Sequence, residues 1–392
     1  MSGNMPIPLG EIMASKSGSV DPSKFPDEVF DLYSVPAYDG GHPEVIAGRD
    51  IGSAKQVIQP GDVLLSRIVP HIRRAWVVGK QRGRRMIASG EWIAFRGKRF
   101  HASYLRYLLL ADRFHARFMQ TVSGVGGSLL RARPVHVADI EVRLPELSEQ
   151  KRIAELLERA DRLRRTRRYA LELSDTFLPA AFLVLFGSTS VQSAPTVGEL
   201  AANKTGAIRT GPFGSQLLHS EFTASGIAVL GIDNAVNNRF EWSERRFIFR
   251  EKYEELRRYT VFPGDVIITI MGTCGRCAIV PDDIPTAINT KHLCCITLDR
   301  ERCLPVYLHG AFLYYPFVRR QLGIATKGAI MDGLNMGIIE GLRVPLPPLS
   351  AQQHFAELVE RHERLRASQG EALRQTEHLF QSLLHQEFSA GL

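Results

Sequence analysis

Two separate stretches of the chain place seam residues at alternating steps of four and three. The first series consists of Ile153, Leu156, Ala160, Leu163, Arg167, Ala170, Ser174, Phe177 and Ala181. The second consists of Phe355, Leu358, His362, Leu365, Gln369, Ala372, Thr376, Leu379 and Leu383. This spacing is that of the a and d positions of a coiled coil, so it predicts two long helices.

Each predicted helix has polar residues at the middle of its seam. Arg167 and Ser174 occupy these layers in the first helix, and Gln369 and Thr376 occupy them in the second. Polar layers weaken a seam but fix its register, and an antiparallel pair would bring the two polar centres together. The alternative is that each helix packs separately on its own domain.

The two helices belong to an internal duplication. Leu144 begins LPELSEQKRIAELLERADRLR and Leu346 begins LPPLSAQQHFAELVERHERLR, an offset of 202 residues. Upstream, Pro60 begins PGDVLLSRIVPHIRRAWVV and Pro263 begins PGDVIITIMGTCGRCAIV, an offset of 203. A repeat at a nearly constant offset over most of the chain indicates two copies of one unit, each a globular region followed by a helix.

The globular regions read as mixed α/β. Short β-rich runs follow the Pro-Gly turns at 62–66 and 265–270, further strands are predicted at 92–95 and 293–298, and helices at 104–118 and 306–320. We therefore expect an α/β (mixed α+β) fold in which two similar domains are joined by two long helices that pair as an antiparallel coiled coil with pseudo-twofold symmetry. The expected segments are 1–146, 147–187, 188–347 and 348–392.

Composition adds a location and a class of partner. The 392 residues contain no apolar run near the roughly 20 residues that cross a bilayer, and the N-terminus does not resemble a signal peptide, which predicts a cytoplasmic protein without a membrane partner. The net charge is +8, and residues 1–146 contribute +6 of it from 20 basic and 14 acidic residues. Such an excess is compatible with nucleic-acid binding.

Several short motifs occur in a fixed order. The second copy contains GPFGSQL at 211–217, the glycine loop at 272–275, Ile288-Asn289-Thr290 and Thr326-Lys327-Gly328, and both copies contain the PGD turn and LPxLSxQ before a helix. In this order and duplication, covering nearly the whole chain, the sequence resembles the specificity subunits of type I restriction-modification systems. The first copy departs from the pattern, because it has no GPFGS and has Val69-Pro70-His71-Ile72 in place of the glycine loop.

The resemblance implies a division of labour. In this family each target-recognition domain reads one half of a split site in double-stranded DNA, and the helices act as a ruler and bind the modification (methyltransferase) subunits. Restriction (endonuclease) subunits join through the complex, and the specificity subunit itself is not an enzyme. A helix of about 35 residues would be about 50 Å long, or about 15 base pairs of DNA. The two domains differ in sequence, so the half-sites should differ.

Candidate DNA contacts are side chains that hydrogen-bond base edges or phosphates from loops. In the first domain we expect them to include Arg67, Arg73, Arg74, Arg82, Arg84 and Arg85. In the second domain we expect them to include Arg209, Ser215, Gln216, Arg276, Asn289, Lys291 and Lys327. For any single arginine the alternative is a solvated surface charge.

A catalytic or metal site is not expected. Cys274, Cys277, Cys294 and Cys295 could bind zinc with His292, but adjacent cysteines on a strand point to opposite faces, so we predict reduced thiols, no metal and no cofactor. No phosphate-binding loop, dinucleotide fingerprint or HExxH motif is present. Two alternatives stay open: a nucleic-acid-modifying enzyme with an unrecognised, metal-assisted site, and a coiled-coil adaptor that does not bind DNA.

Overall fold

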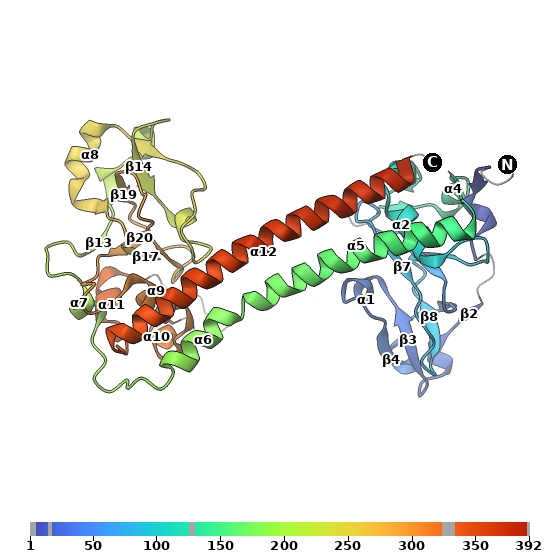
Figure 1. Cartoon of the computed structure of the whole chain (residues 1–392), viewed down its shortest axis with the longest axis horizontal. Helices are drawn as coiled ribbons and strands as arrows, with labels where there is room; N and C mark the ends of the chain where they lie inside the picture. Colours follow the sequence, from blue (N-terminus) through green and yellow to red (C-terminus); the bar gives the residue numbers. More distant parts are fainter. Residues whose placement is uncertain (1–4, 15–17, 125–129, 324–333, 390–392) are drawn as a thin grey trace. The chain divides into compact units, whose positions relative to one another are not determined.

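The computed structural model describes residues 5–14, 18–124, 130–323 and 334–389, and these residues form two compact units. Unit 1 consists of residues 1–169 and 370–392, and unit 2 of residues 170–369. The two longest helices, α5 (Leu147–Ser174) and α12 (Leu349–Ser389), each contribute residues to both units (Figure 1). The predicted mixed fold of two domains and two long helices is confirmed.

Unit 1 contains two principal sheets. The first has the order β2-β5-β8-β3-β4, in which β3 and β8 are parallel and the other pairs antiparallel, and the second is the antiparallel sheet β7-β6-β9. Its strands are β1 (Ile7–Pro8), β2 (Ser19–Val20), β3 (Val29–Tyr33), β4 (Glu44–Ala47), β5 (Lys55–Val57), β6 (Val63–Ser66), β7 (Ala75–Val77), β8 (Arg85–Ala88), β9 (Trp92–Phe95), β10 (Val122–Ser123), β11 (Arg131–Ala132) and β12 (Glu141–Val142). Its short helices are α1 (Val35–Asp39), α2 (Ala102–Leu110), α3 (Asp112–Gln120) and α4 (Pro134–Ala138).

Unit 2 has the same plan. One sheet has the order β15-β14-β19-β16, in which β14 and β19 are parallel, and the other is the antiparallel sheet β13-β20-β17-β18. Its strands are β13 (Ile208–Thr210), β14 (Ile227–Leu230), β15 (Phe247–Ile248), β16 (Thr260–Val261), β17 (Val266–Thr269), β18 (Cys277–Ile279), β19 (Ala287–Asn289) and β20 (Leu293–Ile296). Its shorter helices are α6 (Phe177–Phe186), α7 (Val197–Leu200), α8 (Arg250–Leu256), α9 (Pro305–Tyr314), α10 (Pro316–Gln321) and α11 (Met336–Gly341).

The strand register shows that the units are copies. Leu64 in β6 pairs with Trp76 in β7, and Ile267 in β17 pairs with Ala278 in β18. The parallel pair β3–β8 of unit 1 likewise corresponds to β14–β19 of unit 2. The duplication found in the sequence is therefore a duplication of sheet topology, and residues at equivalent register positions can be compared directly.

Each predicted helix after the sheets is divided in two. The stretch 104–118 corresponds to α2 and α3, which meet at Ala111, and the stretch 306–320 corresponds to α9 and α10, which meet at Tyr315. Tyr315 has an extended backbone (φ −79°, ψ 113°) because it precedes Pro316, whose ring disfavours a helical residue before it. In both units these helices cover the sheet that contains the PGD turn.

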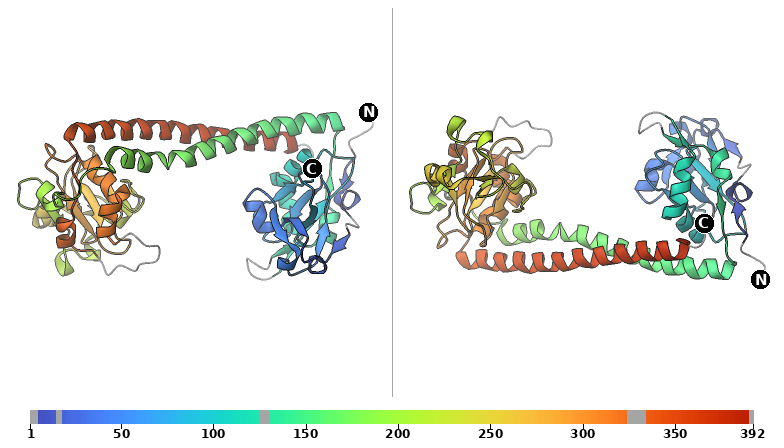
Figure 2. Two further views of the ribbon diagram at one scale, coloured as in Figure 1. Left: turned by 90° about the horizontal axis from the view of Figure 1, so that it is seen from below. Right: turned by 90° about the horizontal axis from the view of Figure 1, so that it is seen from above.

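The long helices pair in antiparallel fashion inside each unit (Figure 2). In unit 1 the start of α5 lies beside the end of α12, where Arg152 contacts Glu387 and Arg168 binds Glu377 at 2.6 Å. In unit 2 the end of α5 lies beside the first half of α12, where the His362 ring nitrogen is 2.8 Å from the Ser174 hydroxyl. The predicted antiparallel pairing is thus present in both units.

The first long helix is interrupted before the position expected from the seam pattern. α5 ends at Ser174 and α6 begins at Phe177, so Asp175 and Thr176 form a turn within the predicted segment. Pro179 explains the interruption, because it lacks the N–H that would bond to the carbonyl four residues earlier and its ring clashes with that carbonyl. The helical stretch still ends at Phe186, followed by Gly187 at the C-cap.

One helical span is long and apolar enough to cross a membrane, judged by its length and composition alone. Within Leu147–Phe186, an 18-residue window is apolar and poorly charged enough to cross a bilayer, and 11% of it is buried. A single helix of this kind is weak evidence for a membrane span. Several of its apolar side chains are exposed, including Tyr169, Leu173 and Val184.

Candidate nucleic-acid interface

The PGD turn of each unit ends in a buried aspartate that holds an arginine. Asp62 is 2% exposed and binds Arg96 through both carboxylate oxygens, at 2.7 and 2.6 Å, and this hydrogen bonding raises the pKa of Arg96. In unit 2, Asp265 binds Arg209 and also accepts a hydrogen bond from Thr297 at 2.6 Å. Both aspartates accept a backbone N–H from three residues upstream. The turn is therefore a structural anchor in both copies.

A glutamine in LPxLSxQ ties each long helix to its unit. Gln150 is fully buried and accepts a hydrogen bond from the N–H of His101 at 2.8 Å. Its amide donates to the carbonyl oxygens of Arg99 and Pro145 at 3.1 and 2.8 Å. These bonds connect the first turn of α5 to the N-terminus of α2, which packs on the three-stranded sheet.

The second copy repeats this network atom for atom. Gln352 is fully buried, accepts the N–H of Leu304 at 2.8 Å, and donates to the carbonyl oxygens of Arg302 and Pro347, both at 3.0 Å. Each copy therefore uses the glutamine to fix the direction in which its helix leaves the globular part. The sequence motif shared by the two copies encodes this anchor.

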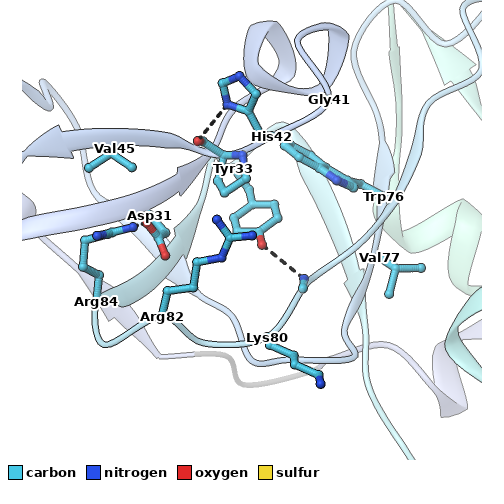
Figure 3. Close-up of a pocket in the computed structure, with 12 residues that line it drawn as sticks. Asp31, Tyr33, Gly41, His42, Val45, Trp76, Val77, Lys80, Arg82 and Arg84 are labelled. Carbon is cyan, nitrogen blue, oxygen red and sulfur yellow. Dashed lines mark hydrogen bonds and ion pairs between the residues drawn. The ribbon is translucent and has the colours of Figure 1, made fainter.

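A polar pocket of unit 1 opens between its two sheets (Figure 3). Its volume is about 320 Å³. Asp31 and Tyr33 from β3 and Trp76 from β7 form its walls, and the loop between β7 and β8 contributes Lys80 and Arg82. The Tyr33 hydroxyl accepts a hydrogen bond from the N–H of Gly79 at 3.1 Å, and burial raises its pKa.

The six arginines predicted in unit 1 fall into two groups. Arg82 and Arg84 line the pocket, and Arg84 binds the buried Asp31 at 2.6 Å. The other four, Arg67, Arg73, Arg74 and Arg85, each contact a carboxylate. For example, Arg74 makes two hydrogen bonds to Asp39, at 3.0 and 3.1 Å, with only 11% of its side chain exposed.

The predicted contact residues of unit 2 differ in how far they are exposed to solvent. Ser215 and Gln216 are exposed in the single turn Gly214–Gln216, where Gln216 accepts a hydrogen bond from the Tyr259 hydroxyl at 2.9 Å. Arg276 is exposed in the glycine loop, and Lys291 is half-buried after β19. Lys327 lies outside the described residues.

Two of the predicted residues of unit 2 are buried. Arg209 is 6% exposed, and besides Asp265 it donates to three backbone carbonyls and to Thr297. Asn289 is fully buried at the end of β19, where its amide nitrogen donates to the carbonyl of Leu293 at 3.1 Å. The Oδ1 atom of Asn289 has no hydrogen-bond partner among the described residues.

Sequence reasoning did not single out Asp31, Tyr33, Trp76 or Lys80. Lys80 lies two residues before the Arg82 cluster, so charge alone could have identified it. The other three come from strands that the sequence does not bring together, because β3 and β7 belong to different sheets. Only the fold places them around one pocket.

The cysteines are free and separate. Cys277 and Cys294 pack in one core cluster and Cys295 in another, as expected for adjacent residues on a strand. Burial raises the pKa of the Cys294 thiol to about 12, and raises that of Cys277 further. Among the residues that the structure describes, no cluster of three or more His, Cys, Asp and Glu side chains could hold a metal ion.

Known proteins share this plan. Residues 221–375 match the family described as type I restriction modification DNA specificity domain. The type I restriction enzyme EcoBI specificity subunit of Escherichia coli is 25% identical over 171 residues, which are 43% of this chain and 36% of that protein. The matched segment therefore spans about a third of that relative.

Two solved structures resemble almost the whole chain. One, from a study of complex assembly and conformational transition of the type I R-M system, has a TM-score of 0.64 at 19% identity and covers 99% of this chain and 98% of its own. The other, a type I restriction-modification S subunit from M. genitalium, has a TM-score of 0.57 at 12% identity, with 97% and 95% covered. These likenesses concern the fold, and the family match concerns residues 221–375. The chain therefore carries a type I restriction-modification DNA specificity domain match at residues 221–375, and almost its whole length has the fold of type I specificity subunits.

Proposed function

We propose that this chain is the DNA-recognition subunit of a type I restriction-modification complex, in which unit 1 and unit 2 each read one half of a bipartite target. The observation that carries the proposal is one scaffold with two different surfaces. The anchors Gln150 and Gln352 are identical in both copies, whereas Trp76 of unit 1 is replaced at the equivalent register by Ala278 of unit 2. A repeated frame with divergent surfaces suits a reader of two unlike half-sites.

The contact residues of this proposal are the predicted residues that line the pocket of unit 1 and the accessible predicted residues on the loops of unit 2. In unit 1 they are Arg82 and Arg84, with the loop that precedes β8. In unit 2 they are Ser215, Gln216, Arg276 and Lys291, which are exposed or half-buried. Cations on loops suit phosphates and the acceptor atoms of guanine in the major groove. Lys327 and the remaining arginines stay predictions.

We further propose that the paired helices set the separation of the half-sites and bind the methyltransferase subunits. Apolar side chains stand exposed along α5 and α6, including Leu173, which is 51% exposed, and Val184, which is 84% exposed. Exposed apolar side chains gathered along neighbouring elements are typical of protein–protein contact sites. The chemistry would then belong to the methyltransferase subunits, with restriction subunits joining the complex in the cytoplasm and this chain non-catalytic.

The test is to introduce this gene with its neighbouring methyltransferase gene into a bacterium whose DNA is unmethylated, and to map methylation by single-molecule sequencing. We expect one new motif made of two different half-sites around a fixed gap. Deleting residues 196–347 should alter or abolish that motif. Absence of any motif, with both proteins soluble and associated, would instead favour the adaptor or enzyme alternatives.

A further inference from the structure

The pocket of unit 1 has a rigid aromatic wall. The Trp76 ring is packed by three other rings, with centroid distances of 4.5 Å to Tyr33, 5.6 Å to Tyr38 and 6.2 Å to Trp92. Trp92 is itself fixed by a hydrogen bond from its indole N–H to the carbonyl of Tyr33, at 3.0 Å. Trp76 nevertheless remains partly exposed and lines the pocket (Figure 3). An aromatic ring held in this way is a preformed stacking surface.

The rim of the same pocket is positively charged. Lys80, Arg82 and Arg84 line it, whereas Asp31 is the only acidic residue in its lining. Arg84 is bound to Asp31, so the excess charge rests on Lys80 and Arg82, both exposed on the loop between β7 and β8. Two cations beside an aromatic surface match a ligand that has a flat ring and a negative charge.

The repeated scaffold does not require these residues. At the register position of Trp76, unit 2 has the buried Ala278, and at that of Asp31 it has the buried Ala228. A buried carboxylate is costly unless it is paired, and here it needs Arg84 to offset that cost. Unit 2 builds the same sheets with apolar residues at both positions, so the pocket is a feature added to unit 1.

The pocket volume limits the ligand. About 320 Å³ is near the lower end of the range of small-molecule sites, roughly 300–1,000 Å³, which fits one ring system with a short polar group. Nucleobases stack on aromatic side chains whatever their identity, and phosphates bind lysine and arginine.

We propose that this pocket binds a single nucleotide, with its base against Trp76 and its phosphate held by Lys80 and Arg82. The nucleotide is either one unit of a DNA strand turned out of the stack or a free deoxynucleoside monophosphate, since both present the same chemistry. The first case deepens the proposed DNA recognition and rests on it, whereas the second does not.

The test compares two matched pairs of charge changes in the full chain. Lys80→Gln with Arg82→Gln removes the cations of the pocket, and Lys24→Gln with Lys98→Gln removes two exposed charges of unit 1 outside it. One arm measures binding of dAMP and dTMP by equilibrium dialysis. The other measures, by fluorescence anisotropy, binding of a duplex that carries the mapped motif, with the methyltransferase subunits present.

Trp76 supplies the second readout. Trp76→Phe keeps a ring and should bind like the wild type, whereas Trp76→Leu should weaken binding about tenfold, the usual order for loss of one base–aromatic stack. The pocket charge variant should also bind at least about tenfold more weakly than the Lys24 and Lys98 control. Thermal unfolding of every variant shows whether unit 1 has kept its fold, and the charge variants alter only exposed side chains.

The two arms separate the sources of the ligand. Losses in the duplex arm identify a nucleotide of DNA, and losses only in the dialysis arm identify a free nucleotide. Equal affinities of pocket and control variants in both arms would overturn the proposal, as would a loss confined to the charge variant with Trp76→Leu unaffected. If the wild type yields no methylation motif, the proposed function fails, but the dialysis arm still decides on the pocket.

Discussion

Gln352 is a single residue on which the attachment of a whole helix depends. Its buried amide makes three hydrogen bonds, and Met at this position would fill a similar volume while leaving the N–H of Leu304 and two carbonyls without partners. We expect Gln352→Met to lower the free energy of unfolding by about 2–4 kcal/mol, since each unsatisfied buried group costs about 1–3 kcal/mol. Urea unfolding followed by circular dichroism measures this change.

The adjacent Gln353 provides the matched control. It is exposed on the same turn of α12, so Gln353→Met should change the unfolding free energy by less than about 0.5 kcal/mol. Equal effects at the two positions would show that the buried network does not anchor the helix. The equivalent change at Gln150 should destabilise unit 1 to a similar degree, because its three bonds are the same.

His309 makes the stability of unit 2 depend on pH. Its ring nitrogen contacts the carbonyl oxygens of Asn238 and Cys277 at 3.0 and 3.1 Å, and desolvation lowers its pKa below the usual value of about 6.5. Below that value the unfolded chain takes up a proton that the folded ring does not, so protonation favours unfolding. Stability should therefore fall as the pH drops below about 6.5.

The measurement is the free energy of unfolding in urea at about pH 7.5 and about pH 5.5, above and below that ordinary pKa. His309→Gln keeps a donor for the two carbonyls but does not titrate, so its loss of stability between the two pH values should be smaller than that of the wild type. Identical losses in both proteins would assign the pH dependence to other groups, among them His115 and His292, whose pKa values are also lowered.

At the scale of single residues, the sequence predicted where basic side chains gather better than it predicted which carboxylates bind them. It identified a cluster of arginines in unit 1, but Arg74 and Arg85 bind carboxylates that are distant in the chain. Arg209 is held by Asp265, 56 positions away, in the same turn that signalled the duplication. A basic residue shows its charge in the sequence, whereas the acid that neutralises it is known only from the fold.

At the scale of elements, the surface of α6 stands out because it exposes large apolar side chains. Val184 is 84% exposed and Leu183 is 41% exposed, although both belong to a nearly continuous apolar run. If this surface binds the methyltransferase subunits, as proposed, a charge there should disrupt the contact. We expect Val184→Asp to weaken co-purification with those subunits at least about tenfold, because an apolar residue at an interface centre is replaced by an unpaired charge.

Val135→Asp is the control for this change. Val135 is also a helical valine, 75% exposed, and it lies on α4 of unit 1. It should leave both the yield and the association unchanged. If Val184→Asp protein associates as well as the control, the exposed face of α6 does not carry the contact, and other residues of α5 or α12 must do so.

The elements were predicted well where periodicity was strong and less well where a local break intervened. The seam pattern located α12 and the start of α5 to within about two helical turns, and the PGD turns located β6 and β17. The pattern could not show the turn at Asp175, because Phe177 and Ala181 continue the seam spacing beyond it. Hydrophobic spacing records which side chains face a partner, not whether the backbone between them is continuous.

For the whole molecule, the internal duplication is the property from which most of the architecture could be predicted. Two copies of one fold, each anchored to its helices by the same glutamine network, were visible in the sequence as two conserved offsets. The pocket of unit 1 was not, because it arises where the copies differ. What the copies share identifies the architecture, whereas a difference such as Trp76 against Ala278 marks where the two proposed DNA-reading surfaces diverge.

The ruler role of the helices can be tested by lengthening both together. One heptad inserted after Arg167 in α5 and one after Gln369 in α12 preserves the a and d pattern of each seam. Seven residues add about 10 Å of helix, or about 3 base pairs of DNA. If the helices set the separation of the half-sites, methylation mapping should return both half-sites unchanged with a gap longer by about 3 base pairs. A heptad in α5 alone, which mismatches the pair, serves as the control and should abolish methylation. An unchanged gap in the double insertion would show that the flexibility of the units, not the length of the helices, determines the spacing.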